Sequence, residues 1–335
     1  MLKRFIILCL LPILLFCACT KNTQEEITFS SWGSVTEVGI LNNIIKEYEK
    51  ENPKVKINFM HIPQNYFQKI HLLFASNQAP DVIFINNLYL PLYASKLEPL
   101  NNVVNTENFN SKSIEAMSIN AKLYAVPRDI STLVFYRNKN LVKTTPQNLN
   151  ELIPTIKEVR PYGISYEKDI YFMLPYVLTM NEDFLNPQKS AEFYKNLEGR
   201  YAPTASQIGS LTLAQLFLQG KIGLYLSGRW MYPKIKESAD FEWDVIPFCG
   251  IVPLDASGWA ISKNSKHKEQ AEKFLNYLSS KKSIEYFNST GLIIPARNDV
   301  KIDNLTFEQS IKNAKPLEYG KNYKKSADKL NKELF

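Results

Sequence analysis

The sequence predicts an α/β protein with two domains. Its 335 residues are enough to form two hydrophobic cores, and the 45% content of hydrophobic residues is typical of a globular chain. Strand-like and helix-like segments alternate along residues 27–85, in the order found in doubly wound sheets. Residues 123–140 then separate this region from a second one of similar character. This stretch either joins two lobes and contributes to a site between them, or belongs to one ordinary sheet.

The first region is expected to form three strands and two helices. The strands occupy residues 27–31, 55–60 and 81–85, and the helices occupy residues 36–48 and 66–75. The third strand, DVIFI, is continuously apolar, as in a parallel sheet that is buried on both faces. Because binding sites in such sheets lie at the carboxyl ends of the strands, we expect a site near Trp32, residues 64–66 and residues 86–89.

Residues 123–140 have a polar first half and an apolar second half. Pro127, Arg128, Asp129 and Ser131 are turn-forming or hydrogen-bonding residues, so we expect a loop at the edge of a cleft. Residues 132–136, TLVFY, predict a strand because they are β-branched, aliphatic and aromatic. Further along the chain we expect helices at residues 149–159, 188–197, 211–218, 268–280 and 283–287, strands at residues 221–226, 243–247 and 257–262, and a weakly helical tail at residues 319–335.

The N-terminus has the features of a bacterial lipoprotein signal peptide. Lys3 and Arg4 precede an apolar run, residues 5–16, that is shorter than the ~20 residues of a membrane-spanning helix. The pair Ala18-Cys19 resembles a lipobox, so we expect residues 1–18 to be removed, Cys19 to carry lipid and residues 19–26 to form a polar tether. The alternative is an ordinary signal peptide that is cleaved without lipidation.

The remaining residues give no support for catalysis or for a cofactor or metal site. His61, His71 and His267 are scattered, and the chain contains no HExxH motif, no CxxC pair and no P-loop. After loss of the signal peptide, Cys249 is the one cysteine besides Cys19, so no internal disulfide is expected. Its apolar neighbours predict a buried thiol. The formal charge of +7 is spread along the chain and does not indicate nucleic acid.

A series of short motifs occurs in a fixed order along the chain. They are residues 27–33 with a tryptophan turn, APDV at residues 79–82, LEPL at residues 97–100, YAVP to YRNK at residues 124–139, GK to GRW at residues 220–230, GWAIS and the following helix at residues 258–280, and GLIIPAR at residues 291–297. Together these motifs resemble the bacterial extracellular solute-binding proteins of family 1, the receptors of ABC importers for sugars and related solutes. Asn86, Asn87 and Leu88 depart from the family pattern, in which an acidic residue often follows the APDV strand.

The resemblance implies two α/β lobes that are joined by crossing strands and close on a ligand through a hinge. It assigns residues 27–125 and 257–298 to the first lobe, residues 126–137 to the crossover, and residues 138–256 and 299–335 to the second lobe. It implies a monomeric, non-enzymatic receptor on the outer face of the cell membrane, or facing the periplasm. This receptor would deliver a carbohydrate to a membrane permease.

Candidate ligand contacts are aromatic rings and planar hydrogen-bonding groups, because proteins bind sugars with both. The ring candidates are Trp32, Trp230, Trp259 and Tyr66, with Tyr171 and Phe172 as further possibilities in the second lobe. The polar candidates are Asn87, Arg128, Asp129, Ser131, Ser227, Gly258 through its backbone, and Arg297. The alternatives are core packing for the tryptophans, an interlobe salt bridge for Arg128 and Asp129, and a helix cap for Arg297.

Two other functions also fit the sequence. Arg128, Arg229 and Arg297 also suit an anionic solute such as a glycerol-phosphate derivative. A surface lipoprotein that keeps the fold but acts as an adhesin or regulator is the second alternative, and it predicts a cleft without aromatic residues.

Overall fold

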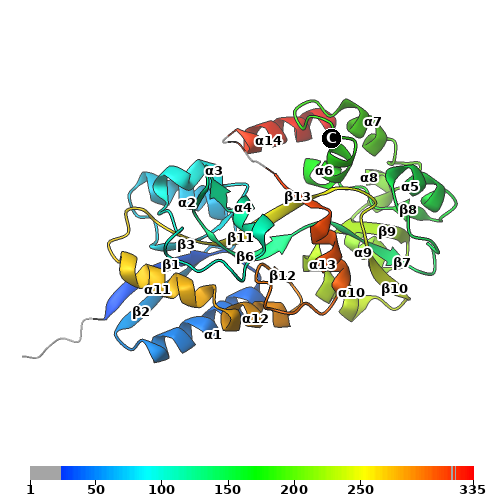
Figure 1. Cartoon of the computed structure of the whole chain (residues 1–335). Coiled ribbons are helices and arrows are strands. Elements are labelled where there is room, and N and C mark those ends of the chain that lie inside the picture. Colours follow the sequence, from blue (N-terminus) through cyan, green and yellow to red (C-terminus); the bar gives the residue numbers. More distant parts are fainter. Residues whose placement is uncertain (1–23, 318–319, 321) are drawn as a thin grey trace, which may run out of the picture.

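The computed structural model describes residues 24–317, 320 and 322–335 (Figure 1). The predicted signal peptide, Cys19 and most of the predicted tether therefore lie outside the described residues. Every helix in the described part of the chain is too short or too polar to cross a lipid bilayer. The same residues contain no group of His, Cys, Asp and Glu side chains that could hold a metal ion.

A seven-stranded sheet and the helices packed on it form what we call the first lobe. Its strands are β1 (Glu25–Ser31), β2 (Val55–His61), β3 (Val82–Asn86), β6 (Val126–Ser131), β11 (Val252–Ile261), β12 (Ile294–Pro295) and β13 (Ala314–Pro316). Strand β1 pairs in parallel with β2 and β3, which confirms the doubly wound order predicted for this region. Strand β11 runs antiparallel to β3 and β6, and β12 closes the far edge beside β6.

The helices of the first lobe cover both faces of this sheet. They are α1 (Val35–Glu51), α2 (Tyr66–Ala75), α3 (Leu90–Tyr93), α4 (Ser111–Ala116), α11 (Lys268–Leu278) and α12 (Lys281–Ser289), with the 3-10 turn Ala94–Lys96 and a small hairpin of β4 (Ser118–Ile119) and β5 (Lys122–Leu123). Helix α1 begins with a capping box, in which the Ser34 side chain accepts from the Glu37 backbone and Glu37 accepts from the Ser34 backbone. Such a cap stabilises a helix start by about 1 kcal/mol.

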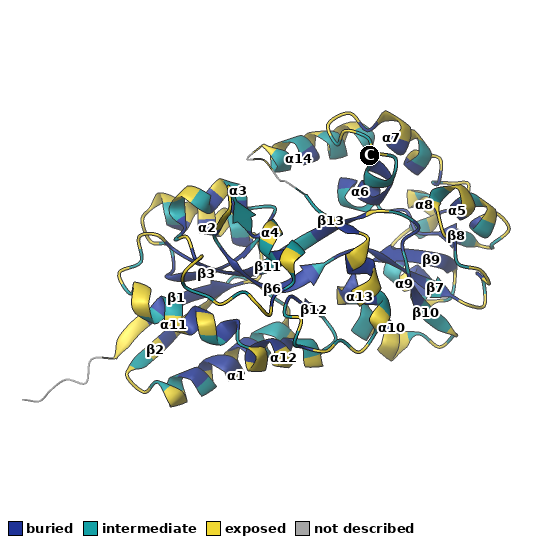
Figure 2. Cartoon of the chain, viewed as in Figure 1, coloured by how far each residue is buried: buried dark blue, intermediate teal, exposed yellow. Residues whose placement is uncertain are grey.

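A four-stranded sheet and its helices form the second lobe. The sheet order is β10-β7-β9-β8, with bounds β7 (Val134–Asn138), β8 (Tyr162–Ile164), β9 (Ile222–Ser227) and β10 (Trp243–Pro247). The helices are α5 (Leu149–Ile156), α6 (Ile170–Thr179), α7 (Gln188–Lys195), α8 (Ala205–Ile208), α9 (Leu213–Leu218), η2 (Arg229–Met231), α10 (Tyr232–Ser238), α13 (Leu305–Lys312) and α14 (Tyr323–Leu334). Buried residues concentrate in the strands of both lobes, and exposed residues lie on the outer helix faces (Figure 2).

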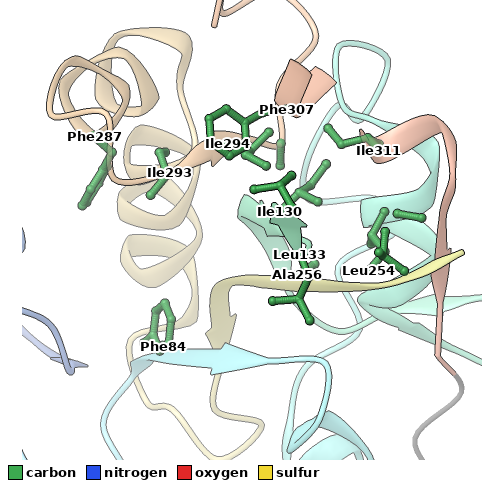
Figure 3. Close-up of a cluster of buried hydrophobic side chains, with 14 of the residues drawn as sticks. Phe84, Ile130, Leu133, Leu254, Ala256, Phe287, Ile293, Ile294, Phe307 and Ile311 are labelled. Carbon is green, nitrogen blue, oxygen red and sulfur yellow. The ribbon is translucent and has the colours of Figure 1, made fainter. Parts of the chain in front are cut away.

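The lobes meet where β6 of the first sheet leads into β7 of the second. The chain passes between the two sheets at Thr132 and Leu133, both fully buried. Strand β11 also reaches this junction, where its first residues pair with β13. A buried apolar cluster fills the space around these strands (Figure 3). The predicted crossover, residues 126–137, contains β6 and most of β7; the lobe boundaries themselves remain a prediction.

The expected loop at residues 127–131 is wrong, because these residues form strand β6. This strand pairs with β11 on one side and β12 on the other, so its backbone polar groups have partners within the sheet. Its charged side chains Arg128 and Asp129 are each only 5% exposed. The polar composition that suggested a turn instead belongs to a buried ionic network.

Candidate ligand-binding cavity

A cavity of about 610 Å³ lies between the two lobes, within the size range typical of small-molecule sites. On the first-lobe side it is lined by Trp32, Glu37, Phe84, Arg128, Asp129 and Ser131. On the opposite side it is lined by Asp169, Tyr171, Trp230, Tyr323, Lys324 and Asp328. The cavity thus combines aromatic rings with carboxylates and hydroxyl groups from segments far apart in the sequence.

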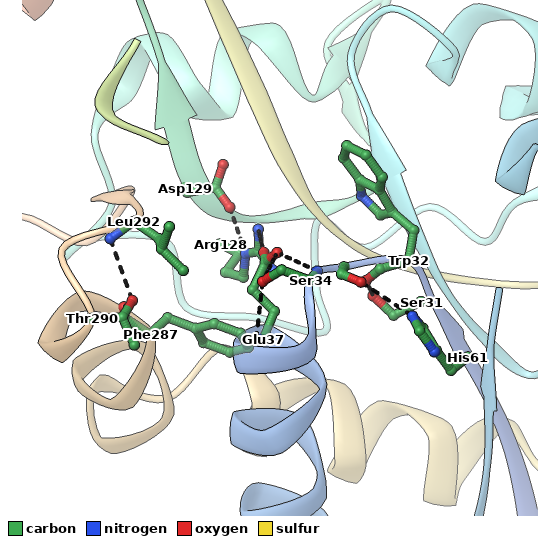
Figure 4. A network of polar contacts seen from close by, with 11 residues as sticks. Ser31, Trp32, Ser34, Glu37, His61, Arg128, Asp129, Phe287, Thr290 and Leu292 are labelled. Carbon is green, nitrogen blue, oxygen red and sulfur yellow. Dashed lines mark hydrogen bonds and ion pairs between the residues drawn. The ribbon is translucent and has the colours of Figure 1, made fainter. Parts of the chain in front are cut away.

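Arg128 is the centre of the first-lobe wall (Figure 4). Its Nε donates to Asp129 Oδ2 at 2.5 Å, and one terminal nitrogen lies 3.3 Å from Glu37 Oε1. Its guanidinium carbon lies 5.2 Å from the ring centroid of Phe84 and 4.7 Å from that of Phe287. The two carboxylates and the ring faces together compensate the loss of water around this buried cation. Because Glu37 also closes the capping box of α1, the start of that helix is tied to β6.

Asp129 has an unusual environment for a carboxylate. Burial raises the pKa of Asp129 above its ordinary value, the Arg128 guanidinium opposes that rise, and the Glu37 carboxylate adds to it. Two carboxylates therefore share one cation at this wall. The network as a whole keeps an excess of negative charge beside the cavity.

The raised pKa of Asp129 predicts a specific dependence of stability on pH. Between the ordinary aspartate pKa of 3.8 and the raised value, the folded chain holds more protons than the unfolded chain. The contribution of Asp129 to the free energy of unfolding therefore falls as pH rises through this window and is constant above it. Urea unfolding at several pH values should show the wild type losing stability relative to Asp129→Asn across the window. A difference that stays flat or rises with pH would contradict this assignment.

Trp32 and Trp230 present ring surface to the cavity from its two sides. Trp32 follows β1 directly, is 49% exposed, and has its ring centroid 6.0 Å from that of Phe84. Trp230 lies in η2 just after β9 and is 38% exposed. A Cβ added at Gly228 would lie 1.9 Å from the Trp230 ring, so glycine there allows the ring to fold back over the backbone. Both tryptophans, which are ring candidates from the sequence, therefore line the cavity from positions just after a strand.

The far wall of the cavity is built by α6 and α14. The Asp169 side chain accepts from the Tyr171 backbone and caps the start of α6. Asn331 of α14 accepts from the Ile170 backbone at 2.7 Å, which joins the two helix ends. Phe335 packs edge-on against Tyr166 and Tyr194. Tyr171 was a further candidate from the sequence, whereas no sequence pattern points to Tyr323, Lys324 or Asp328. The tail carries no motif, and only its weak helical periodicity hinted at a folded segment.

Three of the other candidates lie in the interior of the first lobe and do not line the cavity. Trp259 is fully buried, with its ring 5.4 Å from Phe29 and 5.5 Å from Phe84. The Tyr66 hydroxyl donates to the Ser30 carbonyl and accepts from the Phe84 backbone, which links β1 to β3. Asn87 is 3% exposed, and its side-chain oxygen accepts from the Ala256 backbone. These side chains hold the sheet that carries the site.

The remaining three candidates also have structural surroundings away from the cavity. Ser227 is 1% exposed at the end of β9. Gly258 lies at the irregular pairing of β11 with β6, where an added Cβ would be 1.9 Å from the Val126 carbonyl oxygen. Arg297 donates through two nitrogens to Asp299 and through the third to the Ser279 carbonyl, which ties the end of α11 to the chain after β12.

Cys249 is buried, as predicted, and burial raises the pKa of its thiol to about 12. The thiol therefore stays protonated at neutral pH and is a weak nucleophile. Its role in the fold is that of a small apolar side chain.

Comparison with known sequences identifies the family. The family model described as "Bacterial extracellular solute-binding protein" matches residues 32–285. The maltodextrin-binding protein MdxE of Bacillus subtilis is 26% identical over 306 residues, covering 76% of this chain and 70% of its own. The multiple sugar-binding protein of Streptococcus mutans is 21% identical over 334 residues, covering 84% of this chain and 79% of its own.

Solved structures show the same fold. The maltose-maltodextrin binding protein of Alicyclobacillus acidocaldarius superposes with a TM-score of 0.79 at 21% identity, covering 92% of this chain and 95% of that one. An ABC substrate-binding protein of Listeria monocytogenes, solved with cycloalternan, gives a TM-score of 0.77 at 21% identity and covers 93% and 92% of the two chains. The matched residues run from Trp32 at the cavity to α12, and the two-lobed fold extends beyond them. The chain therefore belongs to the bacterial extracellular solute-binding proteins, a family of solute receptors and not of enzymes.

Proposed function

We propose that this chain is the extracytoplasmic receptor of an ABC importer, which binds a carbohydrate in the interlobe cavity and delivers it to a membrane permease. The observation that carries the proposal is the pairing of two exposed tryptophans, Trp32 and Trp230, with a wall of carboxylates in one cavity. Sugar C–H faces pack against aromatic rings, and sugar hydroxyls donate to carboxylates. The relatives named for maltodextrin and for multiple sugars support the same ligand class.

The charges around the cavity favour a neutral sugar over an anionic solute. Among the residues that the structure describes, five carboxylates and two cationic side chains line the cavity. Arg128 already has two carboxylate partners, and Lys324 pairs with Asp328. Arg229 pairs with Asp303, Arg297 pairs with Asp299, and neither lines the cavity. The arginines that suggested a glycerol-phosphate derivative are therefore engaged within the protein.

Anionic sugars are expected to bind at least about tenfold more weakly than neutral sugars of equal size, because carboxylates outnumber cationic side chains among the described residues that line the cavity. Isothermal titration of maltotriose and of a maltotriose with a terminal uronate would measure the difference. Added salt should reduce the difference in affinity between the two sugars, since it screens the repulsion between the uronate and the carboxylates. Equal or tighter binding of the uronate, or tight binding of a glycerophosphodiester, would reverse the assignment of ligand class.

The proposal as a whole is tested by identifying what the chain retains. Native mass spectrometry of the purified protein would detect a co-purified solute. Titrating the protein with a panel of sugars, and following its tryptophan fluorescence, would rank its affinities for them. Binding of at least one neutral oligosaccharide with a fluorescence change is expected, because Trp32 and Trp230 line the cavity. The absence of any response across mono- and oligosaccharides would overturn the carbohydrate assignment.

The proposed location rests on the N-terminal sequence. Removal of residues 1–18 and lipidation of Cys19 would anchor the receptor to the outer face of the cell membrane, beside its permease. We also propose that the receptor acts as a monomer. Metabolic labelling with a palmitate analogue would show incorporation that is lost on Cys19→Ser substitution.

A further inference from the structure

Lys112 makes a contact that joins the two lobes outside the ligand cavity. It lies in the first turn of α4, which packs against β6, β11 and β13. Its Nζ donates to the carbonyls of Ile311 and Lys312, both at 2.9 Å, at the end of α13, and to that of Ala314 at 2.7 Å, in β13 of the first-lobe sheet. The bonds to Ile311 and Lys312 are the ones that cross between the lobes. All three ammonium protons are therefore used within the protein, by acceptors about 200 residues away in the chain.

The three acceptors suit a cation for a physical reason. Ile311 and Lys312 are the last residues of α13, where the regular hydrogen bonds from the next turn end; the Ile311 carbonyl also accepts from the backbone of the capping Asn313. The end of a helix also carries a partial negative charge from the aligned peptide dipoles. An ammonium group placed there makes charge-assisted hydrogen bonds that a neutral side chain does not provide.

Helix α13 belongs to the second lobe by its packing. It packs against β10 of the four-stranded sheet, and its Phe307 and Ile311 join the apolar cluster around Leu133 and Leu254 (Figure 3). Just before its start, Asp303 pairs at 2.5 Å with Arg229. The Arg229 guanidinium lies between the rings of Tyr232 and Phe307, at 4.9 and 4.7 Å. Both ends of α13 are thus held by cations.

The contact at the start of α13 reaches the wall of the cavity, because Arg229 directly precedes Trp230. Helix α13 therefore connects Lys112, on the first lobe, to η2, which presents Trp230 from the second lobe. We propose that Lys112 is a positioning residue, which fixes the angle between the lobes and so assembles the two walls of the ligand cavity. It acts through α13 and touches no bound ligand.

The decisive variant is Lys112→Met, which keeps the length of the side chain and removes its charge. The distance between the lobes would be measured by electron spin resonance, with labels at Lys50→Cys on α1 and Glu192→Cys on α7. The leader-free chain with Cys19→Ser leaves only the buried Cys249 thiol as a competing labelling site.

Lys112→Met should broaden the distribution of distances between the two labels and move it to longer distances, and Lys112→Arg should restore the wild-type distribution. Lys273→Met, which breaks a surface pair with Glu269 on α11, is the matched control and should change nothing.

The functional consequence is measured with maltotriose. If the assembled conformation becomes a minor one in Lys112→Met, affinity falls in proportion to its population, and we expect a loss of about fivefold or more. An unchanged distance distribution in Lys112→Met would overturn the inference, even if its melting temperature fell, because that result indicates a merely structural contact. The distance measurement needs no ligand, so it remains decisive if maltotriose fails to bind the wild type and the proposed function fails.

Discussion

Replacing Arg128 with methionine is expected to lower the free energy of unfolding by about 3–5 kcal/mol. The substitution leaves Asp129, only 5% exposed, without its 2.5 Å partner, and leaves Glu37 without its contact to β6. Removing one member of a buried ion pair is costly because the other charge stays in a poorly solvated place. Urea unfolding at neutral pH, followed by circular dichroism, would measure the loss.

The double variant Arg128→Met with Asp129→Asn separates this effect from lost packing. It removes the stranded carboxylate, so it should recover a large part of the stability that Arg128→Met alone loses. Arg128→Lys keeps the charge but not the planar fork, and an intermediate loss is expected. If Arg128→Met costs less than about 1 kcal/mol, or if the double variant is no better than the single one, the ionic network is not a support of this sheet.

Replacing Trp230 with alanine is expected to weaken carbohydrate binding about 30-fold, or ~2 kcal/mol, with little change in thermal stability. The ring is 38% exposed and lines the cavity, so its loss removes ligand contact and leaves the core intact. Trp230→Phe retains a ring face and should recover much of the affinity. Isothermal titration and differential scanning calorimetry together would give both quantities.

Trp259 supplies the contrast for this prediction. Trp259→Ala should destabilise the fold by about 3–5 kcal/mol, because the ring is fully buried between Phe29 and Phe84. Any loss of affinity in that variant should follow the loss of folded protein. A Trp230→Ala variant that binds normally would remove this tryptophan from the proposed site.

The contrast between these tryptophans also shows where sequence reasoning succeeds. Trp32 follows β1 of the first sheet and Trp230 follows β9 of the second, and binding sites of α/β sheets lie beyond strand ends, so both positions were candidates from the sequence. Trp259 lies inside β11, which pairs with β3 on one side and with β6 on the other, and its side chain is fully buried. The sequence alone does not reveal this burial, because the segments that cover Trp259 lie far away in the chain.

The same limit explains the error at residues 127–131. Their composition is that of a turn, and the strand forms because β11 and β12 pair with it from more than 100 residues away. The partner of Arg128 on α1, Glu37, is 91 residues distant. Helix α14 is a similar case, since Asn331 finds its partner 161 residues away at Ile170. Local periodicity predicted the elements, while long-range pairing decided which side chains face the cavity.

The unequal construction of the two cavity walls has a consequence for redesign. The first-lobe wall contains the buried Arg128 and Asp129, so changes there disturb folding before they alter ligand choice. The opposite wall presents Asp169 and Asp328, which are exposed, from two helices that the first-lobe network does not include. Libraries aimed at new ligands should therefore vary α6 and α14 and leave β6 untouched. Natural divergence in ligand choice would be expected to follow the same route.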